Sequence, residues 1–426
     1  MTTAKELLKQ RYYEPIKEQP ELFVGIELEY PVVNLSGNAT DVSLTKQLLV
    51  YLLDNFDFHS DNNPIQLIDK ASGDMILFEV SYNTIEFAFA KAERISEVEE
   101  RLDTYLGIIQ PYLQNHNHEL QGWGVNPNWV KNDNRPVKSP RYEMLMDFLE
   151  LSKAKKDPFF HDYPEYGSFI CGSQVQLDVS KTSYLRVLNA FNQIEGPKAV
   201  LLANSEFWGS DWDLALSRDV FWENSMHGVF EENAGVFPKM FKSEDDYFSY
   251  LSETAIFTAK RGDETYYFEP IRAKDYLSTS SVKAHSIHGE VVTIEPSEED
   301  FKTHRSYQFQ DLTTRGTIEF RSVCTQPFSS TFAPAAFHLG LLVNLENLEN
   351  ILNDSPFFEA FDYDFPRIRR LFSKKDISAT DLKMILSLTE SLLSCAEDGL
   401  KSRGFGEEVY LAPLREKLDK LNKSLA

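Results

Sequence analysis

The stretch FVGIELEYPVV, residues 23–33, places two glutamates inside an otherwise apolar run. Successive side chains of a β-strand point to opposite faces, so Glu27 and Glu29 share one face while the apolar residues around them occupy the other. The simplest interpretation is a half-exposed strand whose polar face meets water. The alternative is that both carboxylates point into a functional site, and the rest of the sequence has to decide between the two.

The composition is that of a globular protein with a strong acidic excess. The 426 residues are 42% hydrophobic and 13% aromatic, and 43 basic against 66 acidic residues give a net charge of -23. This charge disfavours nucleic acid and anionic membrane surfaces as main partners, so we expect small-molecule substrates instead. The sequence leaves the oligomeric state open.

Three widely spaced cysteines, Cys171, Cys324 and Cys395, show no CxxC spacing. Such a sparse, odd set is typical of reduced thiols in a cytosolic protein rather than of a disulfide framework or a zinc site. The first residues are a charged helix candidate without an apolar signal core, and no run of about eighteen apolar residues occurs. We therefore expect a cytoplasmic protein with inert buried thiols, and a redox link between Cys171 and Cys324 is left open as an alternative.

Strand patterns that carry acidic residues are separated by helix patterns along the whole chain. Long helices are predicted over 93–115 and from about residue 378 onward, and a helix pair over 183–204 is expected to break at Gly196–Pro197. The polar stretch 260–305 is predicted to form long loops with short strands, as a lid would. These features predict an α+β fold and one catalytic domain over residues 1–426.

A second strand-like stretch, ILFEVSYNTIEFAF at residues 76–89, contains Glu79 and Glu86. Seven residues apart, they would point to opposite faces of one continuous strand. The polar residues 81–84 supply turn chemistry, and a hairpin at that point would return both carboxylates to one face. Taken alone, both positions are compatible with a solvated hairpin.

Two further strand-like stretches carry polar residues in alternation. GSQVQLDVS, residues 172–180, and TIEFRS, residues 317–322, contain Gln174, Gln176 and Asp178, and Glu319 and Arg321, respectively. The first stretch could be the wet side of an edge strand, and Glu319 and Arg321 could simply pair with each other.

Together, five strand glutamates that point into one space would repel one another unless cations lie among them. Carboxylate oxygens in that number suit Mg²⁺ or Mn²⁺. Arg321, on the same face as Glu319, would then neutralise negative charge that the cations leave uncompensated, such as the charge of a phosphate group during transfer. Neither a GxxxxGK[ST] nor a GxGxxG motif occurs in the sequence. The pattern therefore favours nucleotide chemistry without a P-loop.

The order of an ExE strand, paired glutamates, a QxQ strand and an ExR strand resembles the glutamate–cysteine ligases, in the branch shared by plants and many bacteria. SPRYEMLMDFLE and KAVLLANSEFWGSDWDLALSRDVFW are similar to further family motifs. The resemblance covers about residues 22–345 and leaves a helical C-terminal extension, about 346–426, outside. It implies a glutamine-synthetase-like catalytic domain, in which a curved antiparallel sheet has the glutamates on its concave face and helices packed on its back.

The resemblance also implies roles for individual residues. Arg218 and Arg321 would be catalytic and would meet the phosphates of ATP, Gln176 would lie beside the nucleotide, and Arg141 and Tyr142 would hold substrate. The implied cofactor is Mg²⁺, or Mn²⁺ in its place, with ATP as co-substrate. The implied metal ligands are Glu27, Glu29, Glu79, Glu86, Gln174 and Glu319.

The implied reaction joins the γ-carboxylate of glutamate to the amine of cysteine through a γ-glutamyl phosphate. Two stretches depart from the family pattern, ENSMHGVFEENAG after Trp222 and SVCTQPF after Arg321. Two alternatives therefore stay open: a γ-glutamyl ligase with another amine as acceptor, and a non-catalytic relative that binds nucleotide or metal.

Overall fold

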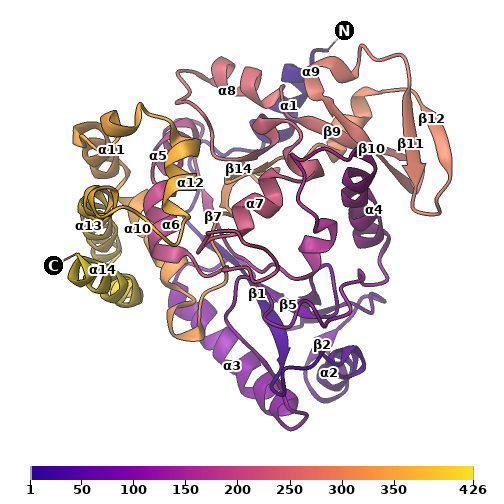
Figure 1. Ribbon diagram of the computed structural model, residues 1–426, viewed down its shortest axis with the longest axis horizontal. Helices are drawn as coiled ribbons and strands as arrows, with labels where there is room; N and C mark the ends of the chain where they lie inside the picture. The colour runs from indigo at the N-terminus through magenta and orange to yellow at the C-terminus, as the bar shows by residue number, and fades with distance from the viewer. Residues whose placement is uncertain (1, 426) are drawn as a thin grey trace.

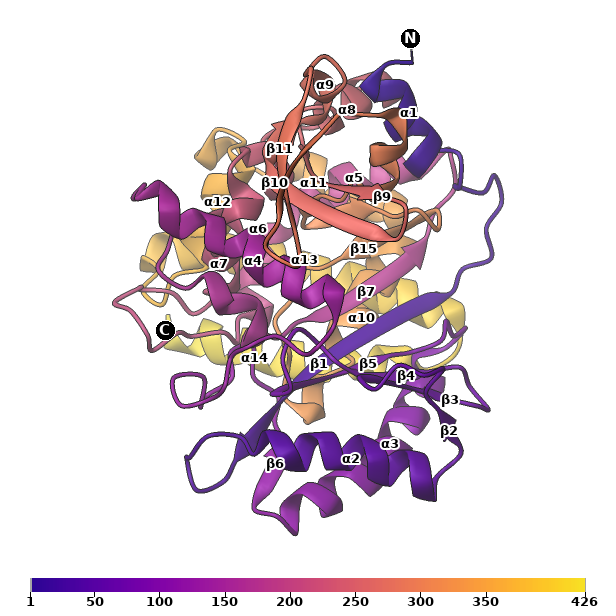
Figure 2. The ribbon, with the colours of Figure 1, turned by 90° about the vertical axis from the view of Figure 1, so that its right-hand side faces the viewer.

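The computed structural model describes residues 2–425, in which nine strands form one open, antiparallel sheet. Strand β1 (Val24–Asn34) lies near its middle, between β7 and β5 (Figure 2). The order along the sheet is β14 (Gln310–Leu312), β15 (Thr317–Phe320), β7 (Ser173–Asp178), β1, β5 (Thr84–Ala88), β4 (Met75–Phe78), β3 (Gln66–Asp69) and β2 (Phe58–His59), and β6 (His118–Leu120) pairs with the end of β1.

Helices cover the apolar face of this sheet, which confirms the predicted α+β fold. Ile26, Leu28 and Tyr30 of β1 are at most 2% exposed on that face. Tyr105 of α3 (Ile95–Gln114) stacks on Phe87 of β5, with ring centroids 6.2 Å apart. The helices beside the sheet include α2 (Val42–Asn55), α5 (Tyr184–Gln193) and α10 (Ala333–Val343), and α11 (Leu345–Asp354) packs on α5.

The C-terminal helices lie at one side of the molecule and a second sheet lies at the other (Figure 1). Gly340 of α10 and Gly399 of α13 approach closely, because a Cβ at Gly399 would lie 2.0 Å from the Gly340 carbonyl oxygen. The remaining helices are α1 (Ala4–Tyr12), α4 (Pro140–Lys155), α6 (Glu195–Leu202), α7 (Arg218–Glu223), α8 (Glu244–Leu251), α9 (Ala273–Tyr276), α12 (Phe365–Phe372), α13 (Ala379–Arg403) and α14 (Ala412–Ser424).

Residues 260–305 contain more regular structure than the sequence predicts. Strands β9 (Ala255–Arg261), β10 (Glu264–Arg272), β11 (Val282–Ser286) and β12 (Val291–Ile294) form an antiparallel four-stranded sheet. The β9–β10 hairpin turns at Gly262, whose φ of +61° suits glycine. The prediction of short strands here is confirmed, but that of long loops was wrong, because burial alternates along β11 and not along β10, so the stretch shows no clear period in the sequence.

The helix pair at 183–204 breaks at Ile194 and not at Gly196–Pro197, so that detail of the prediction was wrong. Both residues lie in the first turn of α6, where a proline lacks only an N–H that has no intrahelical partner. Gly196 also lets α12 approach, since a Cβ there would lie 2.6 Å from Ile368 Cγ2.

Within residues 2–425, no single helix is long and apolar enough to cross a membrane, and one bent pair, Phe328–Val343 with Leu345–Asp354, passes that test by length and composition only. The single-domain and cytoplasmic assignments stay predictions.

Candidate active site

The strand register brings the polar side chains of the central strands onto one face. Glu29 of β1 lies directly opposite Glu86 of β5, and Glu27 lies opposite Gln174 of β7. On the other side of β7, Gln176 lies opposite Glu319 of β15. Six of the predicted site residues therefore follow from pairing alone, because same-face neighbours across antiparallel strands are close in space.

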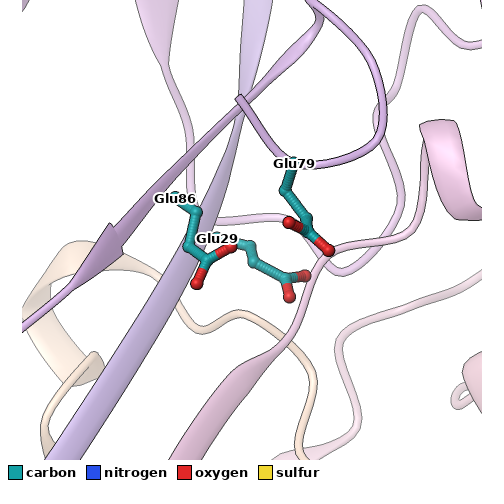
Figure 3. Close-up of side chains that lie close together, drawn as sticks. All are labelled: Glu29, Glu79 and Glu86. Carbon is teal, nitrogen blue, oxygen red and sulfur yellow. The ribbon is translucent and has the colours of Figure 1, made fainter. Parts of the chain in front are cut away.

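Glu79 joins this face through the predicted hairpin, which the structure confirms. Strands β4 and β5 pair antiparallel, and Glu79 directly follows β4, with its backbone N–H donating to the Thr84 carbonyl at 3.2 Å. Carboxylate oxygens of Glu29, Glu79 and Glu86 lie within 4.8 Å of one another. The three side chains point toward one another from neighbouring segments (Figure 3). We call these three residues the carboxylate cluster.

Burial and mutual repulsion keep these acids from ionising together. Burial raises the pKa of Glu29 to about 7, helped by the charge of Glu79. Burial and the charge of Glu319 raise the pKa of Glu27 to about 7. The pKa of Glu86 is raised well above its usual value, first by burial and then by Glu79. Convergent carboxylate oxygens in such surroundings are the donor set that Mg²⁺ or Mn²⁺ prefers, so these residues fit a divalent cation.

Two glutamine amides lie between the carboxylates. Gln176 Nε2 donates to Glu27 Oε1 at 3.1 Å and to Glu319 Oε1 at 2.9 Å. Gln174 Nε2 donates to Glu29 Oε1 at 3.3 Å. The Gln176 oxygen accepts from the exposed Arg315, Nη2 to Oε1 at 2.6 Å, and this arginine was missed by the sequence analysis because nothing in its turn sequence distinguishes it.

A cavity of about 210 Å³ opens beside the carboxylate cluster. Glu29 and Glu79 form part of its wall, and aromatic side chains such as Tyr166 and Tyr307 form another part. Its volume lies below the roughly 300–1,000 Å³ of pockets for drug-sized ligands, so it suits molecules of amino-acid size. Its arginines are Arg141, Arg218, Arg305 and Arg321, of which Arg305 was not predicted.

The two predicted catalytic arginines meet at the segment that follows β15: Arg321 belongs to it, and Arg218 is held by its backbone. Arg218 Nη1 donates to the Val323 carbonyl at 2.8 Å and to the Arg321 carbonyl at 3.4 Å. Gly172 makes room for this guanidinium, since a Cβ there would lie 2.5 Å from Arg218 Nη2. Arg321 pairs with Glu319, as the simplest interpretation of their spacing expected, and does so inside the site.

The two predicted substrate residues lie at the start of α4. Tyr142 is buried and its hydroxyl donates to the Glu79 carboxylate. The exposed Arg141 lies over the Tyr142 ring, 5.2 Å from its centroid, and reaches the cavity wall. The structure therefore brings every predicted site residue to the cavity or to the carboxylates beside it.

The cysteines near the site are buried and free. Cys171 Sγ lies 3.7 Å from Thr84 Oγ1, and Cys324 Sγ donates to Ser205 Oγ at 3.1 Å. Burial raises the pKa of the Cys171 thiol, so it is a poor nucleophile.

Comparison with known proteins identifies relatives of the whole chain. The sequence profile of glutamate-cysteine ligase family 2 (GCS2) matches residues 23–421, which extends the resemblance beyond residue 345. The chloroplastic glutamate–cysteine ligase of Medicago truncatula is 20% identical over 382 residues, covering 87% of this chain and 70% of the relative. The chloroplastic enzyme of Arabidopsis thaliana is 20% identical over 388 residues, covering 87% of this chain and 68% of the relative.

Among solved structures, the glutamate–cysteine ligase of Francisella tularensis in complex with AMP matches 95% of this chain and 83% of its own. The match has 12% sequence identity and a TM-score of 0.47. The family profile spans nearly all of the chain, and the chain therefore belongs to the glutamate-cysteine ligase family 2.

Proposed function

We propose that this protein is an ATP-dependent ligase that joins the γ-carboxylate of L-glutamate to the amine of L-cysteine. The observation that carries the proposal is the carboxylate cluster, buried beside a small cavity whose wall also holds Arg218 and Arg321. A carboxylate is a poor electrophile toward an amine, so ligation requires activation. Transfer of the γ-phosphoryl group of ATP to glutamate gives an acyl phosphate and ADP; attack by the amine then forms the amide and releases phosphate.

The proposed metal ligands are Glu27, Glu29, Glu79, Glu86, Gln174 and Glu319. A bound magnesium ion would screen the charge of the ATP phosphates and polarise the phosphorus–oxygen bonds that change. The protein's own carboxylates would orient the nucleotide, and Gln176 would keep Glu27 and Glu319 in place through its amide.

The arginines would stabilise charge as it moves during transfer. Arg218 and Arg321 carry fixed positive charge beside the cavity, which favours the transferred phosphoryl group and the acyl phosphate in a site largely shielded from water. Arg141 and Tyr142, which also line the cavity, would hold the amino-acid substrate. No side chain need shuttle a proton in the first half-reaction, because the attacking carboxylate is already ionised.

The acceptor amine has a second candidate, which a specific observation favours. The departures from the family pattern lie at the cavity: His227 of the first lines it, and the Val323 carbonyl of the second holds Arg218. A γ-glutamyl ligase with another amine as acceptor is therefore the alternative. A binding-only protein is less compatible with two buried acids and a half-buried third kept together, since their repulsion costs stability.

Phosphate release measured with ATP, glutamate and a panel of amines tests the proposal. We expect release that depends on cysteine, with γ-glutamylcysteine as the product. Release with a different amine alone would replace cysteine as the acceptor. If no amine in the panel gives phosphate release, ligase function is contradicted and the binding-only alternative is favoured.

A further inference from the structure

Arg369, from the C-terminal part of the chain, lies under the active site. It belongs to α12, is 1% exposed and is among the largest fully buried side chains of the described residues. Its guanidinium makes four hydrogen bonds: two to the Asp219 carboxylate at 2.7 and 3.2 Å, one to the Ser322 carbonyl at 3.1 Å and one to the Glu195 carbonyl at 2.8 Å. The N–H groups of the guanidinium therefore donate to three separate segments of the chain.

Two of those segments carry the proposed catalytic arginines at the adjacent position. Asp219 directly follows Arg218 at the start of α7, and Ser322 directly follows Arg321 after β15. A single planar group therefore holds the residue next to each arginine, through the side chain of Asp219, 150 residues away, and through the backbone of Ser322.

A further contact links Arg369 to the Arg321 backbone. The Arg369 guanidinium lies 5.2 Å from the ring centroid of Phe309, whose carbonyl accepts the Arg321 backbone N–H at 3.1 Å. Because Phe309 also lines the cavity, Arg369 supports the wall as well as the backbone behind it.

The charges around Arg369 are balanced. Glu195 and Asp219 face Arg369 and Lys198, with Lys198 Nζ 2.6 Å from Glu195 Oε1 and Arg369 Nη1 3.0 Å from Glu195 Oε2. All four residues are at most 5% exposed. We call them the Arg369 network. A neutral, bidentate arrangement of this kind specifies geometry, because an arginine fork holds its partners in a fixed plane.

We propose that Arg369 is a positioning residue that sets Arg218 and Arg321 at one fixed spacing for phosphoryl transfer. The proposal rests on the function proposed above. Arg369 touches no substrate, and it acts through Asp219 and Ser322. Lysine at this position would keep the charge but could not hold both segments, since an ammonium is a point charge without a planar fork.

The test compares Arg369→Lys with a matched control elsewhere in the core. Arg403 also makes a shielded pair, Nε to Glu407 Oε2 at 2.7 Å, with side chains 10% and 1% exposed. Its other bond goes to the Glu93 carbonyl, and no bond joins it to the segments after Arg218 and Arg321 among the described residues. Arg403→Lys therefore measures how much the loss of a shielded guanidinium lowers kcat when it lies away from the active site.

We expect Arg369→Lys to lower kcat about 10- to 100-fold while the KM values for ATP and glutamate stay within about threefold, because displaced groups act on the transition state. Arg403→Lys should keep kcat within about twofold at a temperature where both variants are folded. Equal kcat values in the two variants would overturn the proposal. If Arg369→Lys does not fold, the isosteric Asp219→Asn replaces it with the same expectation and the same overturning result.

Crystal structures of the parent and of the variant give a readout that does not depend on turnover. The guanidinium groups of Arg218 and Arg321 should shift or lose order in the variant, while Arg141, which is held by α4, keeps its place. Unchanged positions of both arginines would overturn the positioning role. An inactive parent would instead contradict the proposed function, so the two failures are distinguishable.

Discussion

Two largely buried charge clusters lie close to one cavity: one contains acids only, and the other contains acids and bases in equal number. The carboxylate cluster holds three acids, and within residues 2–425 no lysine, arginine or histidine forms an ion pair with any of them. The Arg369 network holds two acids and two bases in contact. A buried cluster of one sign is stable only with a ligand of the other sign, whereas a neutral cluster holds geometry by itself.

The largest expected effect is on the free energy of unfolding, which should fall in a variant of the Arg369 network and not in a variant of the carboxylate cluster. Arg369→Met leaves the buried Asp219 without its cationic partner and leaves Glu195 with Lys198 alone, so the free energy of unfolding should fall by about 3–5 kcal/mol. Glu86→Gln removes one of three repelling acids and should leave the metal-free protein as stable as the parent or more so. Urea unfolding of both variants checks the contrast. A loss of similar size in Glu86→Gln would mean that the carboxylate cluster stabilises the fold without a ligand.

The next effect is on turnover. Glu319→Gln should lower kcat about 100-fold or more, because it removes a charge proposed to order the cation and the phosphates, while the amide keeps the side-chain volume. Steady-state release of phosphate from ATP measures it. Glu349→Gln, which breaks only the surface pair with Arg186, is the matched control. Turnover near that of the control in Glu319→Gln would remove this residue from the site.

A smaller effect concerns pH. Glu27 and Glu29 have a pKa of about 7 in the folded protein, against 4.5 as the ordinary value. Between those values the folded protein binds more protons than the unfolded chain, so these residues contribute stability that is full below about pH 4.5 and is lost as the pH rises through about 7. Each pKa unit corresponds to about 1.4 kcal/mol, less for groups that titrate together.

Unfolding of the metal-free parent and of Glu27→Gln/Glu29→Gln, followed from pH 4.5 to 8, checks this expectation. The parent should lose stability relative to the double variant as the pH rises. A parent that gains stability relative to the variant over this range would contradict the raised pKa values.

The difference between the clusters also explains what the sequence could predict. Glu27, Glu29 and Glu319 alternate within strands, so the period of two fixes which face each occupies, and the turn residues between Glu79 and Glu86 complete the set. Local geometry therefore sufficed to assemble most of the carboxylates, and strand register, which sequence spacing does not give, placed them opposite one another.

No pattern in the sequence indicates the contacts of the Arg369 network. Arg369 meets residues 150 and 47 positions away, and its own helix shows only three arginines on a short amphipathic segment. Arg305 and Arg315 were missed for the same reason, because a single arginine in an irregular segment has no period that indicates its partner. Contacts of this kind come from tertiary packing and are visible only in the structure.

The central claim is that the polar face of β1 holds cations with ATP, and the melting temperature tests it most directly. Magnesium with ATP is titrated into the parent and into Glu27→Gln/Glu29→Gln. Binding to the folded state alone should stabilise the parent by about 2.7 kcal/mol at a hundredfold excess over Kd, with a rising melting temperature. The double variant should stay folded and lose the magnesium-dependent rise. The same rise in both proteins would contradict the claim that Glu27 and Glu29 hold the cations.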